Sequence, residues 1–317
     1  MAHTTLVTTP TFSRHSDTPW QLLEDGGAGP VRPAPDTALP RTDLLQLAHE
    51  ADALIVGMDR IDAQVMDAAP HLKVIAKHGV GVDTIDVDAA RERGIPVVAA
   101  PGSNSRAVAE YAFALLLDAA RGLTASHQAL ADGGWPKLFG PELHGKTLGI
   151  VGFGRIGRLL AGYAQAFGMR ILAHDLYVSD DTVRGAGAEP AALDDLLGRA
   201  DAVSLHLPAD PSGAPLLGRE RLKAMRPHAL LVNAARGGLV DETALAELLH
   251  AGHLGGVALD AFSVEPLPAD HPLRGAPRTV LTAHMAACTP EANGAMGTAV
   301  ARSVLDVLAG RTPAYQA

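Results

Sequence analysis

Short apolar runs alternate with helical patterns along most of this chain of 317 residues. From residue 147 onward each run is four or five residues long and mostly apolar, which is typical of strands buried between two layers of helices. Between the runs, apolar residues recur at helical spacing, which predicts amphipathic helices. Six strands with intervening helices form a complete doubly wound sheet. The six predicted strands are residues 147–151, 170–174, 202–206, 229–233, 256–260 and 279–282.

The first hundred residues show the same alternation and predict a second α/β domain. Residues 21–41 contain four prolines and predict one long irregular stretch. Pro101-Gly102-Ser103 interrupts the alternation ahead of a helical pattern at 104–121, and another helical pattern covers 289–309. We expect this last helix to return to the first domain and to make that domain discontinuous. The strand candidates here are residues 6–8, 53–56, 74–76 and 96–99.

Three glycines in the spacing G-x-G-x-x-G follow the strand that begins at residue 147 and precede the helical pattern Arg155–Phe167. Gly152 permits a tight turn, Gly154 lets the backbone approach a pyrophosphate, and Gly157 lets helix and strand pack closely. Asp175 ends the next strand, where a carboxylate can accept hydrogen bonds from both ribose hydroxyls and would repel a 2′-phosphate. This set predicts an NAD site. The alternative is a plain glycine-rich turn in some other parallel α/β unit.

Charge and cysteine content narrow the range of partners. Twenty-six basic and thirty-five acidic residues give a net charge of −9, which argues against nucleic acid or an anionic membrane as a partner. The single cysteine, Cys288, excludes a disulfide framework or a cysteine-rich metal site and is typical of a reducing compartment. The first residues lack a basic segment followed by an apolar one, so we expect no signal peptide and a cytoplasmic protein. We predict no bound metal.

Three chemically distinct side chains follow three neighbouring strands of the predicted sheet. Arg236 comes after the fourth strand, Glu265 after the fifth and His284 after the sixth. Ligands of open parallel sheets bind beyond the carboxyl ends of the strands, so these residues should converge beside the cofactor. Arginine can hold a carboxylate and polarise a carbonyl, and histidine backed by a carboxylate can exchange a hydroxyl proton. Taken singly, Arg236 could instead cap a helix or pair with Asp241, and Glu265 could be an ordinary loop carboxylate.

With these motifs the chain resembles the NAD-dependent D-2-hydroxyacid dehydrogenases over nearly its whole length, closest to the phosphoglycerate dehydrogenase branch. Longer members of that branch carry a C-terminal regulatory domain, which we do not expect here. The matching segments are Gly79-Val80-Gly81-Val82-Asp83, Val108-Ala109-Glu110, the glycine motif, residues 232–237, Asp260 through Glu265-Pro266, and His284.

The resemblance implies a role for each matching residue. Arg236 is the substrate-binding arginine, His284 the acid/base and Glu265 its carboxylate partner, while the loop at Val80 and Gly81 receives the substrate carboxylate. Asp260 is expected near the nicotinamide, and His206 and Pro208 in a loop that flanks the cofactor. The full set of expected cofactor contacts is Gly152, Gly154, Arg155, Ile156, Gly157, Asp175, His206, Pro208, Ala234, Arg236, Asp260 and His284.

Pattern and resemblance together predict an α/β fold of two domains. Residues 102–287 are expected to form a dinucleotide-binding domain with a Rossmann doubly wound parallel sheet. Residues 1–101 and 288–317 are expected to form a flavodoxin-like parallel α/β domain that binds the substrate. The implied reaction is hydride transfer between NAD and a D-2-hydroxy acid or its 2-keto acid, with domain closure near residues 101 and 287 that excludes water.

The sequence leaves two alternative functions open and also predicts a second copy of the chain as a partner. Lys77-His78 and Arg14-His15 could bind a distal anionic group, as in a phosphoglycerate- or phosphonate-type dehydrogenase with a dianionic substrate, although such pairs are more often solvated. A second alternative is an NAD-sensing binding module, like corepressor relatives of this family. The segment Leu123–Leu143, with Trp135, resembles an arm that packs on a second subunit, so a homodimer is expected.

Overall fold

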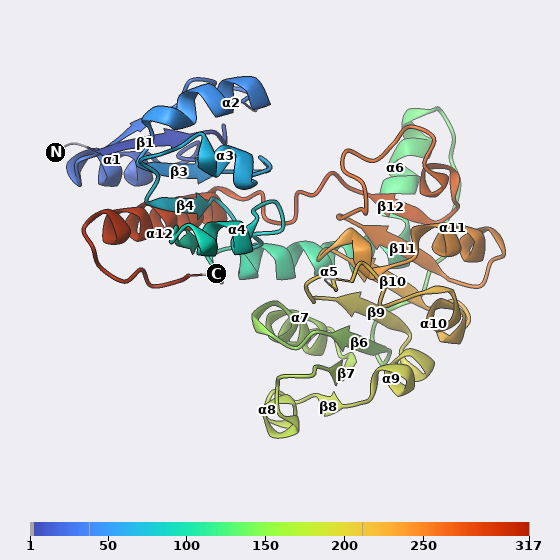
Figure 1. Ribbon diagram of the computed structural model, residues 1–317. Helices are drawn as coiled ribbons and strands as arrows, with labels where there is room; N and C mark the ends of the chain where they lie inside the picture. Colours follow the sequence, from blue (N-terminus) through green and yellow to red (C-terminus); the bar gives the residue numbers. More distant parts are fainter. Residues whose placement is uncertain (1–2, 38, 211, 317) are drawn as a thin grey trace. The chain divides into compact units, whose positions relative to one another are not determined.

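The chain was analysed as a computed structural model that describes residues 3–37, 39–210 and 212–316. The outermost residues of the predicted first domain, 1–2 and 317, lie outside the described residues. The chain divides into two compact units (Figure 1). Unit 1 comprises Met1–Asn104 and Ala287–Ala317, and unit 2 comprises Ser105–Ala286. Each unit has its own parallel sheet with helices on both faces.

The sheet of unit 1 has five parallel strands in the order β2-β1-β3-β4-β5, which is the flavodoxin-like order. Residues from α2, α3 and α4 join the apolar core on one face. Helix α12 packs against α1, β4 and β5, and a Cβ on Gly297 of α12 would lie 2.7 Å from Pro19 of α1, so these helices approach closely. The elements are β1 His3–Val7, α1 Thr18–Asp25, β2 Ala28–Val31, α2 Arg41–Leu47, η1 Ala48–Glu50, β3 Ala53–Val56, α3 Ala63–Asp67, β4 Val74–Lys77, α4 Val87–Glu92, β5 Val97–Val98 and α12 Pro290–Leu308.

The prediction of a long irregular stretch at residues 21–41 is wrong. Helix α1 continues to Asp25 and strand β2 occupies Ala28–Val31. Pro30 is tolerated in this strand because β2 lies at the sheet edge, where a missing N–H breaks no inner hydrogen bond. In the register with β1, Pro30 stands opposite Thr5.

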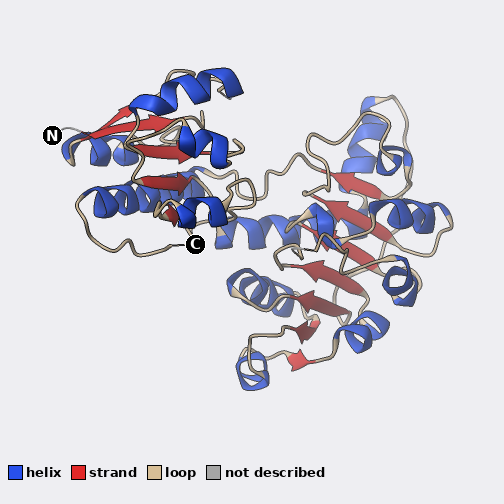
Figure 2. Cartoon of the chain, viewed as in Figure 1, coloured by secondary structure: helices blue, strands red, loops and turns tan. Residues whose placement is uncertain are grey.

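Unit 2 contains seven parallel strands in the order β12-β11-β10-β9-β6-β7-β8 (Figure 2). All six predicted strands are present. Strand β8 was not predicted because it has only two residues and no apolar run. The elements are α5 Ser105–Arg121, α6 Leu123–Ala131, β6 Thr147–Val151, α7 Arg155–Ala166, β7 Arg170–His174, α8 Asp180–Gly185, β8 Glu189–Pro190, α9 Leu193–Arg199, β9 Ala202–Leu205, α10 Arg219–Ala224, β10 Leu230–Asn233, η2 Gly237–Leu239, α11 Glu242–His250, β11 Gly256–Leu259, η3 Pro272–Gly275 and β12 Thr279–Leu281.

The sheet of unit 2 is buried on both faces. Helices α5 and α7 cover one face, and α9, α10 and α11 cover the other. Every residue of β6, β9, β10 and β11 is therefore buried, which explains why these strands are apolar without alternation. The strand order reverses between β6 and β9, and ligands of such sheets bind beyond the carboxyl ends at that reversal. Within the described residues, no helix combines the length and apolar character needed to cross a membrane.

Candidate active site

The turn between β6 and α7 contains three glycines, and its geometry requires glycine at two of them. Gly152 has φ +95°, and a Cβ there would lie 2.5 Å from the backbone oxygen of His206. A Cβ on Gly157 would lie 2.2 Å from the backbone oxygen of Gly152. Gly154 differs, because a Cβ there would meet no atom within 4 Å. The first and third glycines are thus required by packing, whereas the second leaves open space at the start of α7. The expected approach of a pyrophosphate to Gly154 stays a prediction.

Asp175 links the end of β7 to this turn. Its Oδ2 accepts a hydrogen bond from the Phe153 amide at 2.7 Å, and its Oδ1 accepts from the amides of Tyr177 at 2.8 Å and Val178 at 3.0 Å. A carboxylate has about four acceptor positions, so these three bonds leave room for a ribose hydroxyl. The expected contact of Asp175 with both ribose hydroxyls stays a prediction.

His206 follows β9 and faces the same turn with its backbone carbonyl. Its Nε2 lies 2.9 Å from Ser204 Oγ, while its Nδ1 is buried without a hydrogen-bond partner among the described residues. Burial lowers the pKa of His206 to about 4, so the ring is neutral at pH 7. Pro208, two residues further on, is exposed. The loop after β9 therefore borders the glycine turn, as a dinucleotide site requires.

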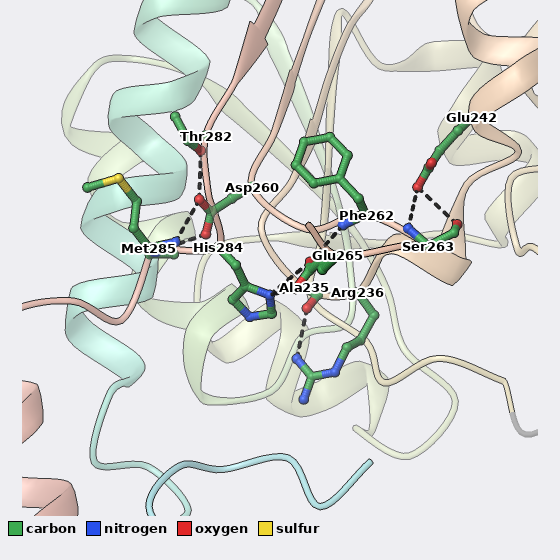
Figure 3. Close-up of polar contacts among 11 residues, drawn as sticks. Ala235, Arg236, Glu242, Asp260, Phe262, Ser263, Glu265, Thr282, His284 and Met285 are labelled. Atoms are coloured by element: carbon green, nitrogen blue, oxygen red, sulfur yellow. Dashed lines mark hydrogen bonds and ion pairs between the residues drawn. The ribbon is translucent and has the colours of Figure 1, made fainter. Parts of the chain in front are cut away.

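The loops after β10, β11 and β12 carry Arg236, Glu265 and His284, respectively. These three strands are neighbours in the sheet, so their loops meet at its carboxyl end (Figure 3). His284 Nδ1 lies 2.8 Å from Glu265 Oε2 and 3.0 Å from Oε1. The His284 backbone has φ +50°, an uncommon conformation for a residue other than glycine. Because Nδ1 contacts the carboxylate and the side chain is 43% exposed, Nε2 is the ring nitrogen that can exchange a proton with a ligand.

Asp260 holds the loop that carries His284. Its side chain is only 1% exposed, and Oδ1 accepts hydrogen bonds from Thr282 Oγ1 at 2.6 Å and the Met285 amide at 2.9 Å. Oδ2 accepts from the Ala286 amide at 2.8 Å. The carboxylate thus joins the end of β11 to both sides of His284. Its expected position near the nicotinamide stays a prediction.

Asn233 organises the loop that carries Arg236, a role that the sequence reasoning missed. Its buried side chain donates to the Arg236 carbonyl at 2.7 Å and accepts from the Ala235 amide at 3.0 Å. Arg236 Nη1 donates to the Ala235 carbonyl at 2.8 Å. A polar residue closing an apolar strand was the only signal for this role. A Cβ on Gly237 would lie 1.8 Å from the Phe262 carbonyl carbon, so the arginine loop packs directly on the loop of Glu265.

The other expected cofactor contacts lie along the same edge. Arg155 is exposed and Ile156 half-buried at the start of α7, and Ala234 is half-buried directly after β10. Within the described ranges, no group of three or more histidine, cysteine, aspartate or glutamate side chains is arranged to hold a metal ion.

Val80 and Gly81 belong to unit 1 and follow β4. Val80 is 39% exposed. Just before them, the Lys77 ammonium donates to the Gly57 carbonyl and lies 3.4 Å from Thr84 Oγ1. Burial lowers the pKa of His78 to about 4. The buried His78 ring is therefore neutral at pH 7, and the suggestion that Lys77-His78 binds a distal anionic group stays a prediction.

The fold and glycine turn of unit 2 define a dinucleotide-binding domain. Residues 113–286 match the sequence model of the D-isomer specific 2-hydroxyacid dehydrogenase, NAD binding domain. The chain belongs to this family, whose members are NAD-dependent oxidoreductases. The predicted family, fold class and cofactor are thereby confirmed.

Individual relatives agree with this placement. The D-3-phosphoglycerate dehydrogenase of Mycobacterium tuberculosis is 47% identical over 273 residues, which cover 85% of this chain and 52% of that enzyme. The chain thus spans about half the length of that relative. The glyoxylate reductase of Thermofilum pendens is 40% identical, with 89% of this chain and 86% of that enzyme covered. The crystal structure of the TT0316 protein from Thermus thermophilus superposes with a TM-score of 0.87 at 40% identity, covering 99% of both chains.

Proposed function

We propose that this chain interconverts a D-2-hydroxy acid and its 2-keto acid by hydride transfer with NAD. The observation that supports this most directly is the contact of 2.8 Å between His284 Nδ1 and Glu265 Oε2, at the same sheet edge as the glycine turn. A histidine oriented by a carboxylate beside a dinucleotide site is suited to moving the proton that accompanies a hydride. We further propose that unit 2 binds the dinucleotide and unit 1 the substrate.

In the reducing direction, Arg236 binds the substrate carboxylate and polarises the keto oxygen through its fixed donors. His284 Nε2 gives its proton to that oxygen as the carbinol forms, and Glu265 stabilises the orientation and the charge of the imidazolium. NADH held at the glycine turn, by Gly152, Gly154 and Asp175, would supply the hydride that reduces the keto carbon. In unit 1, the backbone at Val80 and Gly81 receives the substrate carboxylate. The reverse reaction returns the proton to His284.

We propose that the substrate is a small 2-keto acid without a second anionic group. Near the carboxylate loop of unit 1, His78 is neutral and the Lys77 ammonium already contacts a carbonyl and a hydroxyl. Asp59, after β3, accepts from Thr8 Oγ1 at 2.6 Å and adds a negative charge to this edge of the sheet. A dianionic substrate is the second candidate, because the Mycobacterium tuberculosis relative is named a phosphoglycerate dehydrogenase.

The test is NADH oxidation measured with glyoxylate, hydroxypyruvate, phosphohydroxypyruvate and a branched keto acid. We expect turnover with an uncharged or hydroxylated side chain and a lower kcat/KM for the phosphorylated acid. A preference for phosphohydroxypyruvate would support the dianionic alternative. NADH binding without turnover of any acid would contradict the enzymatic function and support an NAD-sensing module.

We also propose that the protein is a cytoplasmic homodimer. Segment 123–143 exposes several apolar side chains and borders a cavity of about 690 Å³ at the amino ends of the unit 2 strands, which is typical of a surface that a second copy covers. Analytical ultracentrifugation should show a dimer that dissociates in Trp135→Ser/Phe139→Ser but not in the control Tyr177→Ser, which changes another exposed aromatic residue. The exposed side chains are Leu123, Leu130, Trp135, Leu138 and Phe139.

A further inference from the structure

A buried carboxylate lies next to the catalytic loops and has no part in the mechanism above. Glu242 is the first residue of α11 and is only 7% exposed. Its Oε1 accepts hydrogen bonds from the Ser263 amide at 2.7 Å and from Ser263 Oγ at 2.9 Å (Figure 3). Its Oε2 lies 3.0 Å from His271 Nε2. Glu242 is not needed as the helix cap, because Asp241 already accepts from the Ala244 amide.

The Ser263 contact leads directly to the acid/base pair. Ser263 lies in the short turn that runs from Phe262 to Glu265, and the Phe262 amide donates to Glu265 Oε1 at 2.9 Å. On its other side, the same turn packs on Gly237, where a Cβ would lie 2.1 Å from the Ser263 nitrogen. The turn is therefore held between Glu242 and the arginine loop. We expect a displacement of Ser263 to shift the neighbouring Phe262 amide and with it the carboxylate that contacts His284.

A nucleophilic role for Ser263 does not fit this geometry. A serine nucleophile is typically activated by a histidine or an amine that takes the proton directly from its hydroxyl. Here the hydroxyl contacts the Glu242 carboxylate, and His271 contacts the other oxygen of that same carboxylate. The arrangement orients the backbone of the turn and does not activate its hydroxyl.

We infer that Glu242, oriented by His271, is a positioning residue that holds the Ser263 turn so that Glu265 stays in contact with His284. This inference rests on the proposed function of the Glu265–His284 pair. Positioning matters because small displacements of catalytic groups reduce the rate steeply, while substrate and cofactor binding change less. Glu242 hydrogen-bonds Ser263 and contacts His271, so we expect it to act on Glu265 only through the turn.

The test is a double-mutant cycle of Glu242→Gln and Glu265→Gln, with kcat, KM for NADH and the pH profile of keto-acid reduction as readouts. We expect Glu242→Gln to lower kcat on the order of 10-fold, to leave KM for NADH within about twofold, and to shift the midpoint of the pH profile to lower pH. In the Glu265→Gln background the same change should have almost no effect on kcat. The matched control is Glu247→Gln on the same helix, whose carboxylate pairs with Arg219 at 2.6 Å and is 56% exposed.

Equal losses of kcat in both backgrounds, or a loss of thermal stability with an unchanged pH profile, would overturn the inference and leave Glu242 a structural residue. Should Glu242→Gln fail to fold, Glu242→Asp is measured instead. Aspartate keeps the charge, but its shorter side chain cannot reach both Ser263 and His271. Full activity in Glu242→Asp would also overturn the inference. If the native protein turns over no keto acid, the proposed function fails separately. In that case an NMR titration of the His284 ring tests the inference. We expect a lower titration midpoint in Glu242→Gln or Glu242→Asp than in the native protein, and an unchanged midpoint would contradict the inference.

Discussion

At the scale of single residues, the site combines side chains that the sequence identifies with others that only the structure reveals. Arg236, Glu265 and His284 could be proposed because each lies in the loop after a predicted strand and has a chemical role of its own. Asn233 and Glu242 could not, because their roles depend on buried hydrogen bonds that the sequence does not display: Asn233 bonds the backbone of the loop that follows it, and Glu242 bonds Ser263, which is 21 residues further along the chain. Polar residues next to strand ends and helix starts are common, and only three-dimensional contacts separate the supporting ones from the rest.

Removal of Arg236 or His284 should abolish most turnover. We expect Arg236→Ala and His284→Ala each to lower kcat/KM by about two to four orders of magnitude, because acid/base catalysis and substrate orientation are worth that much in typical enzymes. NADH affinity, measured by fluorescence titration, should stay within a few-fold of the native value. A variant that keeps a tenth of native kcat/KM would remove that residue from the mechanism.

At the scale of elements, the β6–α7–β7 unit was predicted correctly because its signals are local. The apolar strand, the glycine spacing and the acid at the next strand end all lie within thirty residues of one another. Strand β2 and the two-residue β8 could not be predicted, because their pairing depends on a neighbouring strand and not on their own composition. Short edge strands have too few residues for a clear pattern of apolar positions, and Pro30 in β2 is a residue type that argues against a strand.

Two glycines of the turn between β6 and α7 should differ in the effect of substitution by alanine. In Gly157→Ala the new Cβ would lie 2.2 Å from a backbone oxygen, so we expect a clear loss of thermal stability. Gly154→Ala meets no atom within 4 Å and should leave stability almost unchanged while lowering NADH affinity at least about tenfold, because the Cβ occupies space for the pyrophosphate. Gly162→Ala, an open helical position in α7, is the control. Native NADH affinity in Gly154→Ala would place the pyrophosphate elsewhere.

The acid at the end of β7 should set the choice of dinucleotide. We expect a strong preference for NAD over NADP, because a 2′-phosphate would face the Asp175 carboxylate. Asp175→Asn keeps one acceptor oxygen for the backbone amides of this turn but removes the charge, and should lower the preference at least about tenfold. The measurement is the ratio of kcat/KM values for the two cofactors. Similar values in the native enzyme would show that a nearby cation compensates for Asp175.

At the scale of the whole molecule, acid should destabilise each unit through a buried histidine. The pKa of His78 in unit 1 and of His206 in unit 2 lies near 4 in the folded chain, below the ordinary value of 6.5. The unfolded chain therefore binds more protons between these values, and stability falls as pH drops from about 6.5 to about 4. For His78 alone the loss is on the order of 3 kcal/mol.

Chemical denaturation at pH 7 and pH 4.5 measures this effect. We expect His78→Gln to show a smaller decrease in the free energy of unfolding between the two pH values than the native chain. His49→Gln, a change at an exposed histidine, serves as the control and should keep the native decrease. An unchanged decrease in His78→Gln would mean that other groups cause the acid sensitivity.

The return of α12 to unit 1 has a consequence for biosynthesis. Ser105–Ala286 is one unbroken segment, so unit 2 has all of its strands as soon as Ala286 has left the ribosome. Unit 1 is translated first but cannot complete its packing, because α12 contacts α1, β4 and β5 and comes from residues made after unit 2. Until α12 has been made, β4 and β5 lack the helix that packs on them, and transiently exposed apolar surface is a feature that chaperones bind. We therefore expect unit 2 to complete its packing before unit 1 does, although unit 1 begins to be synthesised first.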